Sequence, residues 1–134
     1  MTTLIVLCGI PGSGKTTMSK QLAKDYNAIH CSFDELNLAR RQDLFPHITQ
    51  SLEANHSVIA DAPHTDKKIR MKLLQTTDHL DCKRILIFMN TPFEECVRRN
   101  ASRQNPLPFF ILQSFYQTMQ PPTLDEGWDE IITI

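Results

Sequence analysis

Residues 9–16 read GIPGSGKT and fit the pattern G-x-x-x-x-G-K-[ST] in full. A short apolar run, residues 4–8, precedes this segment, and Met18, Leu22 and Tyr26 follow it at helical spacing. Glycines let successive backbone N–H groups converge on an anion without side-chain clashes, and the N-terminus of the following helix adds partial positive charge. The sequence therefore predicts a phosphate-binding loop between a buried strand and a helix.

The polar residues of this loop suit a nucleoside triphosphate. We expect Lys15 to bridge the β- and γ-phosphates, the Thr16 hydroxyl to bind Mg²⁺, and Thr17 to reach an α-phosphate oxygen. The predicted cofactors are ATP and Mg²⁺. The residues expected to contact the nucleotide are Gly9, Pro11, Gly12, Ser13, Gly14, Lys15, Thr16 and Thr17. No N-K-x-D or T-K-x-D guanine signature occurs, which disfavours a GTPase.

Strand-like and helix-like patterns alternate along the whole chain. Strands are predicted at residues 4–8, 28–33, 57–60, 84–89 and 130–134. Helices are predicted at residues 15–26, 35–54, 66–77, 92–102 and 109–119. Within residues 35–54, Phe45-Pro46 marks either a break or the first turn of a second helix. This alternation favours an α/β fold in which helices cover both faces of a mostly parallel sheet of about five strands.

Length and composition indicate one globular domain over residues 1–134, with 41% hydrophobic and 22% charged residues. The formal net charge of −1 gives no overall attraction to nucleic acid. The cysteines (Cys8, Cys31, Cys82 and Cys96) form no C-x-x-C pair, so we expect no disulfide framework. Cys8 and Cys31 stand in apolar strand-like runs, where we expect buried free thiols. Residues 4–8 are too short to span a bilayer and carry no signal-peptide pattern, so we expect a cytoplasmic protein without membrane partners.

Two aspartates follow predicted strands, at the edge where an open α/β sheet binds ligands. Asp34 is a candidate general base for an attacking hydroxyl, or alternatively a cap for a helix starting at Glu35. Asp61 is a candidate Mg²⁺ ligand, or alternatively a turn-forming residue before Ala62-Pro63.

Arg99 and Arg103 are four residues apart and share one face of a predicted helix. They could close over the phosphates and offset charge on the transferring group, or Arg99 could simply pair with Glu95 on an ordinary charged helix. The basic cluster Lys67, Lys68, Arg70 and Lys72 is more typical of a solvated helix face than of a binding patch.

Several segments together resemble the 5′-hydroxyl polynucleotide kinase branch of the P-loop kinases. They occur in family order and cover nearly the whole chain: GIPGSGKTT, HCSFDEL, VIAD, RRNASR, LPFFILQSFYQTM and PPTLDEGWDEI. The resemblance implies a kinase-type P-loop NTPase fold, a three-layer sandwich with a helical lid. It also implies transfer of the ATP γ-phosphoryl group to a 5′-hydroxyl of DNA or RNA. By position, Asp34 matches the family's general base, and Arg99 and Arg103 fit its lid arginines.

The sequence departs from this family on the acceptor side. Phe33 and Asn37 flank Asp34 where the family usually carries a basic residue, and Asp61-Ala62-Pro63-His64 replaces D-x-N. Two alternatives therefore stay open. The first is a kinase of a nucleoside or other small hydroxyl metabolite, with Phe33, His64 and Phe109 shaping a closed acceptor pocket. The second is an ATP-binding regulatory module without transfer activity. The basic residues that could supply a nucleic-acid groove are Arg40, Arg41, Lys67, Lys68 and Arg70.

Overall fold

The computed structural model describes all 134 residues and contains one five-stranded sheet. The strand order is β2-β3-β1-β4-β5, and every neighbouring pair is parallel. The strands are β1 (Thr2–Cys8), β2 (Ile29–Ser32), β3 (Val58–Asp61), β4 (Cys82–Phe88) and β5 (Glu130–Thr133). The predicted α/β class and the number of strands are therefore confirmed.

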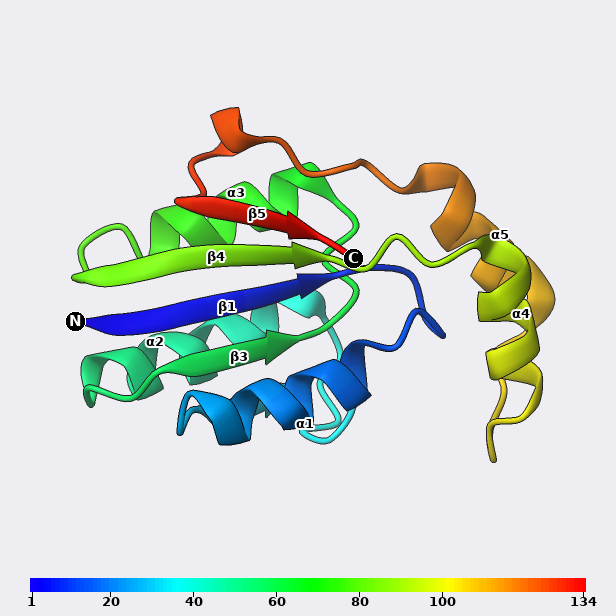
Figure 1. Cartoon of the computed structure of the whole chain (residues 1–134), viewed down its shortest axis with the longest axis horizontal. Helices are drawn as coiled ribbons and strands as arrows, with labels where there is room; N and C mark the ends of the chain where they lie inside the picture. Colours follow the sequence, from blue (N-terminus) through cyan, green and yellow to red (C-terminus); the bar gives the residue numbers. More distant parts are fainter.

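Helices cover both faces of this sheet, as Figure 1 shows. The α-helices are α1 (Lys15–Asp25), α2 (Phe45–Glu53), α3 (Lys67–Thr76), α4 (Phe93–Ala101) and α5 (Phe109–Thr118). Two short 3₁₀ helices are η1 (Arg41–Leu44) and η2 (Leu124–Glu126). Helix α1 lies on one face of the sheet, α2 and α3 lie on the other, and α4 and α5 lie together beyond the carboxyl ends of the strands (Figure 1). None of these helices has the length and apolar character needed to cross a membrane.

The central strand β1 is buried on both faces because its apolar run is continuous. Leu4 and Val6 point into the core formed with α2 and α3, whereas Ile5 and Leu7 point into the core formed with α1. This alternation follows from the two-residue side-chain period of a strand. A third cluster (Ile10, Cys96 and Leu112) attaches α4 and α5 to the loop after β1. All four cysteines are buried and free, which confirms the prediction for Cys8 and Cys31.

The predicted helix over residues 35–54 is wrong in its first part. Turns occupy residues 33–37, bends follow at residues 39–40, and η1 comes next. The alternative that Phe45-Pro46 is the first turn of a second helix is confirmed, because α2 begins at Phe45. Asn37 takes a left-handed backbone conformation (φ 53°), which a helix cannot include, and the Ser32 hydroxyl accepts a hydrogen bond from the Glu35 N–H. Because no helix starts at Glu35, Asp34 is not a helix cap. The other predicted elements match the observed ones to within two residues at each end.

Candidate active site

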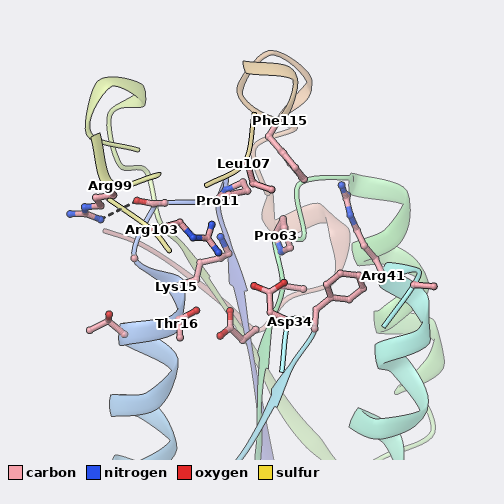
Figure 2. A pocket seen from close by; sticks show the side chains of 17 residues that line it. Pro11, Lys15, Thr16, Asp34, Arg41, Pro63, Arg99, Arg103, Leu107 and Phe115 are labelled. Atoms are coloured by element: carbon pink, nitrogen blue, oxygen red, sulfur yellow. Dashed lines mark hydrogen bonds between the residues drawn. The ribbon is translucent and has the colours of Figure 1, made fainter. Parts of the chain in front are cut away.

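A cavity of about 510 Å³ lies at the carboxyl ends of the strands, next to the first loop. Figure 2 shows Lys15 and Thr16 on one side of it, Asp34 at its floor and Arg41 on the opposite side. Of the residues predicted to form a site, the cavity wall brings together Pro11, Gly12, Gly14, Lys15, Thr16, Thr17, Asp34, Asp61, Arg99 and Arg103. These side chains come from segments up to 92 residues apart in sequence, and the parallel sheet gathers them at one edge.

The loop between β1 and α1 depends on left-handed backbone at two glycines. Gly12 has φ 86° and Gly14 has φ 101°, values that L side chains rarely adopt. A Cβ atom at Gly12 would also lie 2.7 Å from the Cys96 carbonyl oxygen, because α4 packs directly against the loop. Gly9 and Ser13 do not line the cavity. The Gly9 N–H donates to the Pro63 carbonyl (2.9 Å) and Ser13 is buried, so both support the loop from beneath.

Lys15, the first residue of α1, is buried at the foot of the loop. Its Nζ donates to the Ile10 carbonyl oxygen at 2.9 Å. Burial lowers the pKa of Lys15 to about 8, while the carboxylates of Asp61 and Asp34 act in the opposite direction. Lys15 therefore shares the cavity wall with two carboxylates, Asp34 and Asp61.

The start of α1 fits a phosphate group. No side chain caps the N-terminus of α1, so its first N–H groups are free to bind an anion. Thr16 and Thr17 follow immediately and their side chains are exposed. These features suit a triphosphate whose terminal phosphates lie on the loop.

A magnesium ion also fits this wall of the cavity. Asp61 ends β3, lies opposite Leu7 of β1 in the sheet register, and is only 5% exposed. The wall therefore offers one carboxylate and the Thr16 hydroxyl as oxygen ligands. No group of three or more His, Cys, Asp or Glu residues could hold a metal by itself, so phosphate and water oxygens would complete the coordination shell.

Asp34 is exposed and lines the cavity from the turn after β2. The Phe33 N–H donates to the Asp61 carbonyl oxygen (3.0 Å), which fixes the start of this turn against β3. An exposed carboxylate beside the phosphate-binding loop can accept a proton from a hydroxyl group.

The two candidate lid arginines reach the cavity differently. Arg99 lies on α4, where its Nε donates to Glu95 (2.9 Å) and its Nη1 donates to the Gly12 carbonyl oxygen (3.3 Å; Figure 2). Arg99 therefore pairs with Glu95 and lines the cavity at the same time. Hydrogen bonds from Arg98 and Arg99 lower the pKa of Glu95 to about 2. Arg103 lies beyond the end of α4 and pairs with no carboxylate, although it lines the same cavity.

Three residues with predicted surface or pocket roles lie elsewhere. Arg70 is fully buried and paired with Glu126, so it cannot contribute to a nucleic-acid groove. His64 is buried beneath the site, where its Nδ1 lies 2.8 Å from the Leu7 carbonyl oxygen. Phe109 is 54% exposed and outside the cavity. The expected acceptor pocket of Phe33, His64 and Phe109 is therefore wrong in two of its three members.

The cavity wall also contains residues that the sequence did not single out as a group. Phe33, Leu107 and Phe115 give it apolar surface, and Arg41 gives it a positive charge. The Arg41 guanidinium lies 5.3 Å from the centre of the Phe115 ring, within the range of a cation–π contact. Arg41 and Phe115 are 74 residues apart in sequence, so no local pattern links them.

Two family models match the chain. One, described as "AAA domain", matches residues 32–122, and the other, "Chromatin associated protein KTI12", matches residues 1–39. L-seryl-tRNA(Sec) kinase of Methanococcus maripaludis is 24% identical, over 94% of this chain and 56% of that protein. Protein kti12 of Schizosaccharomyces pombe is 25% identical, over 94% of this chain and 54% of that protein. The chain thus spans about half the length of these curated relatives.

Solved structures share the fold at low sequence identity. A sugar kinase from Janibacter sp. superposes with a TM-score of 0.81 at 19% identity, covering 100% of this chain and 85% of that one. Kti12 from Chaetomium thermophilum in complex with ADP-AlF3 gives 0.80 at 18% identity, covering 98% and 88%. A fungal RNA kinase gives 0.77 at 23% identity, covering 100% and 38%. With its parallel five-stranded sheet, its glycine-rich loop and a family model that matches over half of its residues, this chain belongs to the AAA domain family and has a P-loop kinase fold.

Proposed function

We propose that this protein is an ATP-dependent kinase that transfers the γ-phosphoryl group to a 5′-hydroxyl of DNA or RNA. One observation carries the proposal: a single cavity contains the phosphate-binding loop with Lys15, the exposed carboxylate of Asp34, and the two arginines of the α4 region. Phosphoryl transfer needs these three kinds of group in one place, because catalysis rests on positioning and charge stabilisation.

The donor side of the cavity would bind the triphosphate of ATP. The loop and the N-terminus of α1 supply N–H donors, and Lys15 supplies a positive charge for the β- and γ-phosphates. Thr16 and Asp61 would hold Mg²⁺ on this side. When bound, the ion would neutralise charge on the phosphate oxygens.

Asp34 would act as the general base. Its exposed carboxylate lines the same cavity as the loop, and it would accept the proton of the attacking hydroxyl while that oxygen approaches the γ-phosphorus. Arg99 and Arg103 would stabilise negative charge that develops on the transferring group. Arg103 suits this role well because no carboxylate neutralises its charge.

The acceptor side suits a nucleotide end. Apolar surface from Phe33 and Phe115 can contact a sugar or base, and the Arg41 guanidinium can contact a neighbouring phosphate. Two similar proteins are named for substrates that contain RNA, L-seryl-tRNA(Sec) for one kinase and RNA for the other. These features support a nucleic-acid acceptor even though the protein has no extended basic groove.

A second candidate is a kinase of a nucleoside or another small hydroxyl metabolite. The observation that favours it is the engagement of basic residues elsewhere: Arg70 is buried with Glu126, and Arg40 pairs with Asp43 at 3.2 Å. Fewer basic side chains are therefore available to contact the phosphates of a nucleic-acid backbone. The same donor side and the same base would serve this reaction.

An acceptor screen tests the proposal. Purified protein is incubated with γ-labelled ATP and either 5′-hydroxyl DNA or RNA oligonucleotides, or a panel of nucleosides and sugars. We expect the 5′-hydroxyl oligonucleotides to become labelled at their ends, and we expect oligonucleotides that already carry a 5′-phosphate to remain unlabelled. Transfer to small molecules alone would favour the second candidate. Nucleotide binding without transfer to any acceptor would instead indicate an ATP-binding regulatory module.

A further inference from the structure

The geometry points to His30 as a positioning residue that sets the orientation of the Asp61 carboxylate. This inference rests on the proposed function, because it concerns Asp61 as the carboxylate that meets Mg²⁺. His30 itself does not line the cavity, so it would act only through Asp61.

The sheet register brings these two residues together. Strands β2 and β3 are parallel, with Ser32 opposite Asp61 and His30 opposite Ile59. Side chains two residues apart on a strand share a face, so Ile59 and Asp61 point to the same side of the sheet. His30 lies opposite Ile59 on the neighbouring strand and therefore points to that side as well. The His30 Nε2 lies 2.9 Å from Asp61 Oδ2, and the side chains are 14% and 5% exposed.

The chemistry of the pair indicates which of the two bonded atoms carries the hydrogen. An ionised carboxylate only accepts hydrogen bonds, so the Nε2 atom of His30 carries hydrogen and donates it to Oδ2. This is the one side-chain hydrogen bond that Asp61 makes within the protein. The other carboxylate oxygen, Oδ1, is therefore left for ligands in the cavity that Asp61 lines.

This hydrogen bond matters because the terminal torsion of an aspartate is broad and roughly two-fold. Without His30, the Asp61 carboxylate could rotate and present either oxygen at varied angles. Hydrogen bonds behind a metal ligand restrict such rotation, and their loss typically weakens metal binding about 10–100-fold. His30 would thus raise metal affinity without touching the metal.

A purely structural role for His30 makes a different prediction. The same hydrogen bond joins the edge strand β2 to β3, so its loss could lower the free energy of unfolding alone. Metal affinity in the folded protein separates the two roles, because a bridge between strands would not change it.

The test measures Mn²⁺ affinity by electron paramagnetic resonance in the presence of saturating ADP. The variants are His30→Ala, His30→Gln, Asp61→Asn and His79→Ala. His79 is the matched control, because its Nε2 lies 3.3 Å from Glu53 in an exposed pair that is not part of the cavity. We expect His30→Ala to weaken Mn²⁺ binding about 10–100-fold. His30→Gln, which keeps a terminal N–H donor, should restore most of the affinity, and ADP affinity should not change.

Two results would overturn the inference. One is a Mn²⁺ affinity for His30→Ala equal to that of His79→Ala; the other is equal weakening by His30→Ala and His30→Gln. Asp61→Asn separates this inference from the proposed function. If Asp61→Asn weakens Mn²⁺ binding while His30→Ala does not, only the role of His30 fails. If Asp61→Asn also has no effect, the metal role of Asp61 fails and the inference fails with it.

Discussion

Arg70 on α3 and Glu126 in η2 form an ion pair whose side chains are both fully buried. Two hydrogen bonds join the groups, Nε to Oε1 at 2.9 Å and Nη2 to Oε2 at 3.0 Å. The remaining guanidinium nitrogen, Nη1, donates to the His64 carbonyl oxygen at 2.9 Å. Through these bonds, the pair connects the segment before β5 to the loop that follows Asp61, next to the candidate active site.

We expect Glu126→Gln to destabilise the protein strongly. The substitution leaves the Arg70 guanidinium buried without a counter-charge, which typically costs about 3–5 kcal/mol. Burial alone would raise the pKa of Glu126, but hydrogen bonds from Arg70 and Trp128 hold it below its ordinary value, so the native pair is ionised. Urea unfolding measures the change in the free energy of unfolding.

The control for Glu126→Gln is Glu130→Gln, which removes an exposed ion pair. Lys83 and Glu130 lie 3.9 Å apart with both side chains about half exposed. Such pairs contribute at most about 1 kcal/mol. Equal effects of the two substitutions would contradict the role assigned to the buried pair.

The sequence predicted the position of a site residue correctly where that residue belongs to a local sequence pattern. Lys15 could be predicted from the glycine-rich motif between β1 and α1, and Asp34 and Asp61 from their places at or just after the ends of β2 and β3, because parallel strands place such residues at one edge of the sheet. Arg70 could not be placed correctly. It stands among lysines that indicate a solvated face, and its burial depends on Glu126, 56 residues away in sequence.

The turn after β2 was missed for a similar reason. Apolar residues at positions 36, 38 and 39 continue the helical spacing of α2, but the left-handed backbone at Asn37 and the Ser32 hydroxyl bond stabilise turns instead. Arg41 and Phe115 meet only through the tertiary fold. Long-range contacts of this kind leave no local pattern in the sequence.

Asp34→Asn should lower the rate of transfer by orders of magnitude while leaving nucleotide binding intact. Asparagine is nearly isosteric but cannot accept the hydroxyl proton, so we expect turnover to fall about 10²–10⁴-fold. ATP affinity, measured by calorimetry, should stay near the wild-type value. Glu35→Gln is the matched control, because Glu35 is the next residue, is exposed and lies outside the cavity. An active Asp34→Asn variant would remove Asp34 from the proposed role.

Gly12→Ala should weaken nucleotide binding. The left-handed backbone alone costs an alanine about 1–2 kcal/mol, and the new Cβ would lie 2.7 Å from the Cys96 carbonyl oxygen. The loop must shift to relieve this contact, and its N–H groups then no longer converge on one phosphate, so we expect ATP affinity to fall about tenfold, which is 1.36 kcal/mol of binding free energy. Gly127→Ala is the control. It introduces a residue at φ 122° far from the cavity, and should lower stability but not ATP affinity.

Stability should fall on acidification because of His64. Burial lowers the pKa of this residue to about 4 from 6.5, so between these values the unfolded chain binds more protons than the folded protein. The contribution of His64 is therefore complete above pH 6.5 and is lost as the pH falls towards 4, by up to about 3 kcal/mol.

His64→Asn isolates this effect. Asparagine does not titrate and tolerates the left-handed backbone at this position (φ 49°). Urea unfolding from neutral pH down to about pH 4 should show a shallower loss of stability in the variant than in the wild type. Parallel pH profiles would mean that His64 is protonated as readily in the folded protein as in the unfolded chain.

Arg103→Ala should lower turnover more than it lowers ATP affinity. Arg103 lines the cavity and pairs with no carboxylate, so its charge is available to the transferring phosphoryl group. Removing one donor that stabilises developing charge typically costs about 10²–10³ in turnover. Arg98→Ala is the matched control, because Arg98 is exposed, pairs with Glu95 and lies outside the cavity. If single-turnover rates of the two variants agree, Arg103 does not act on the transferring group, and Arg99 alone would have to supply positive charge from the α4 region.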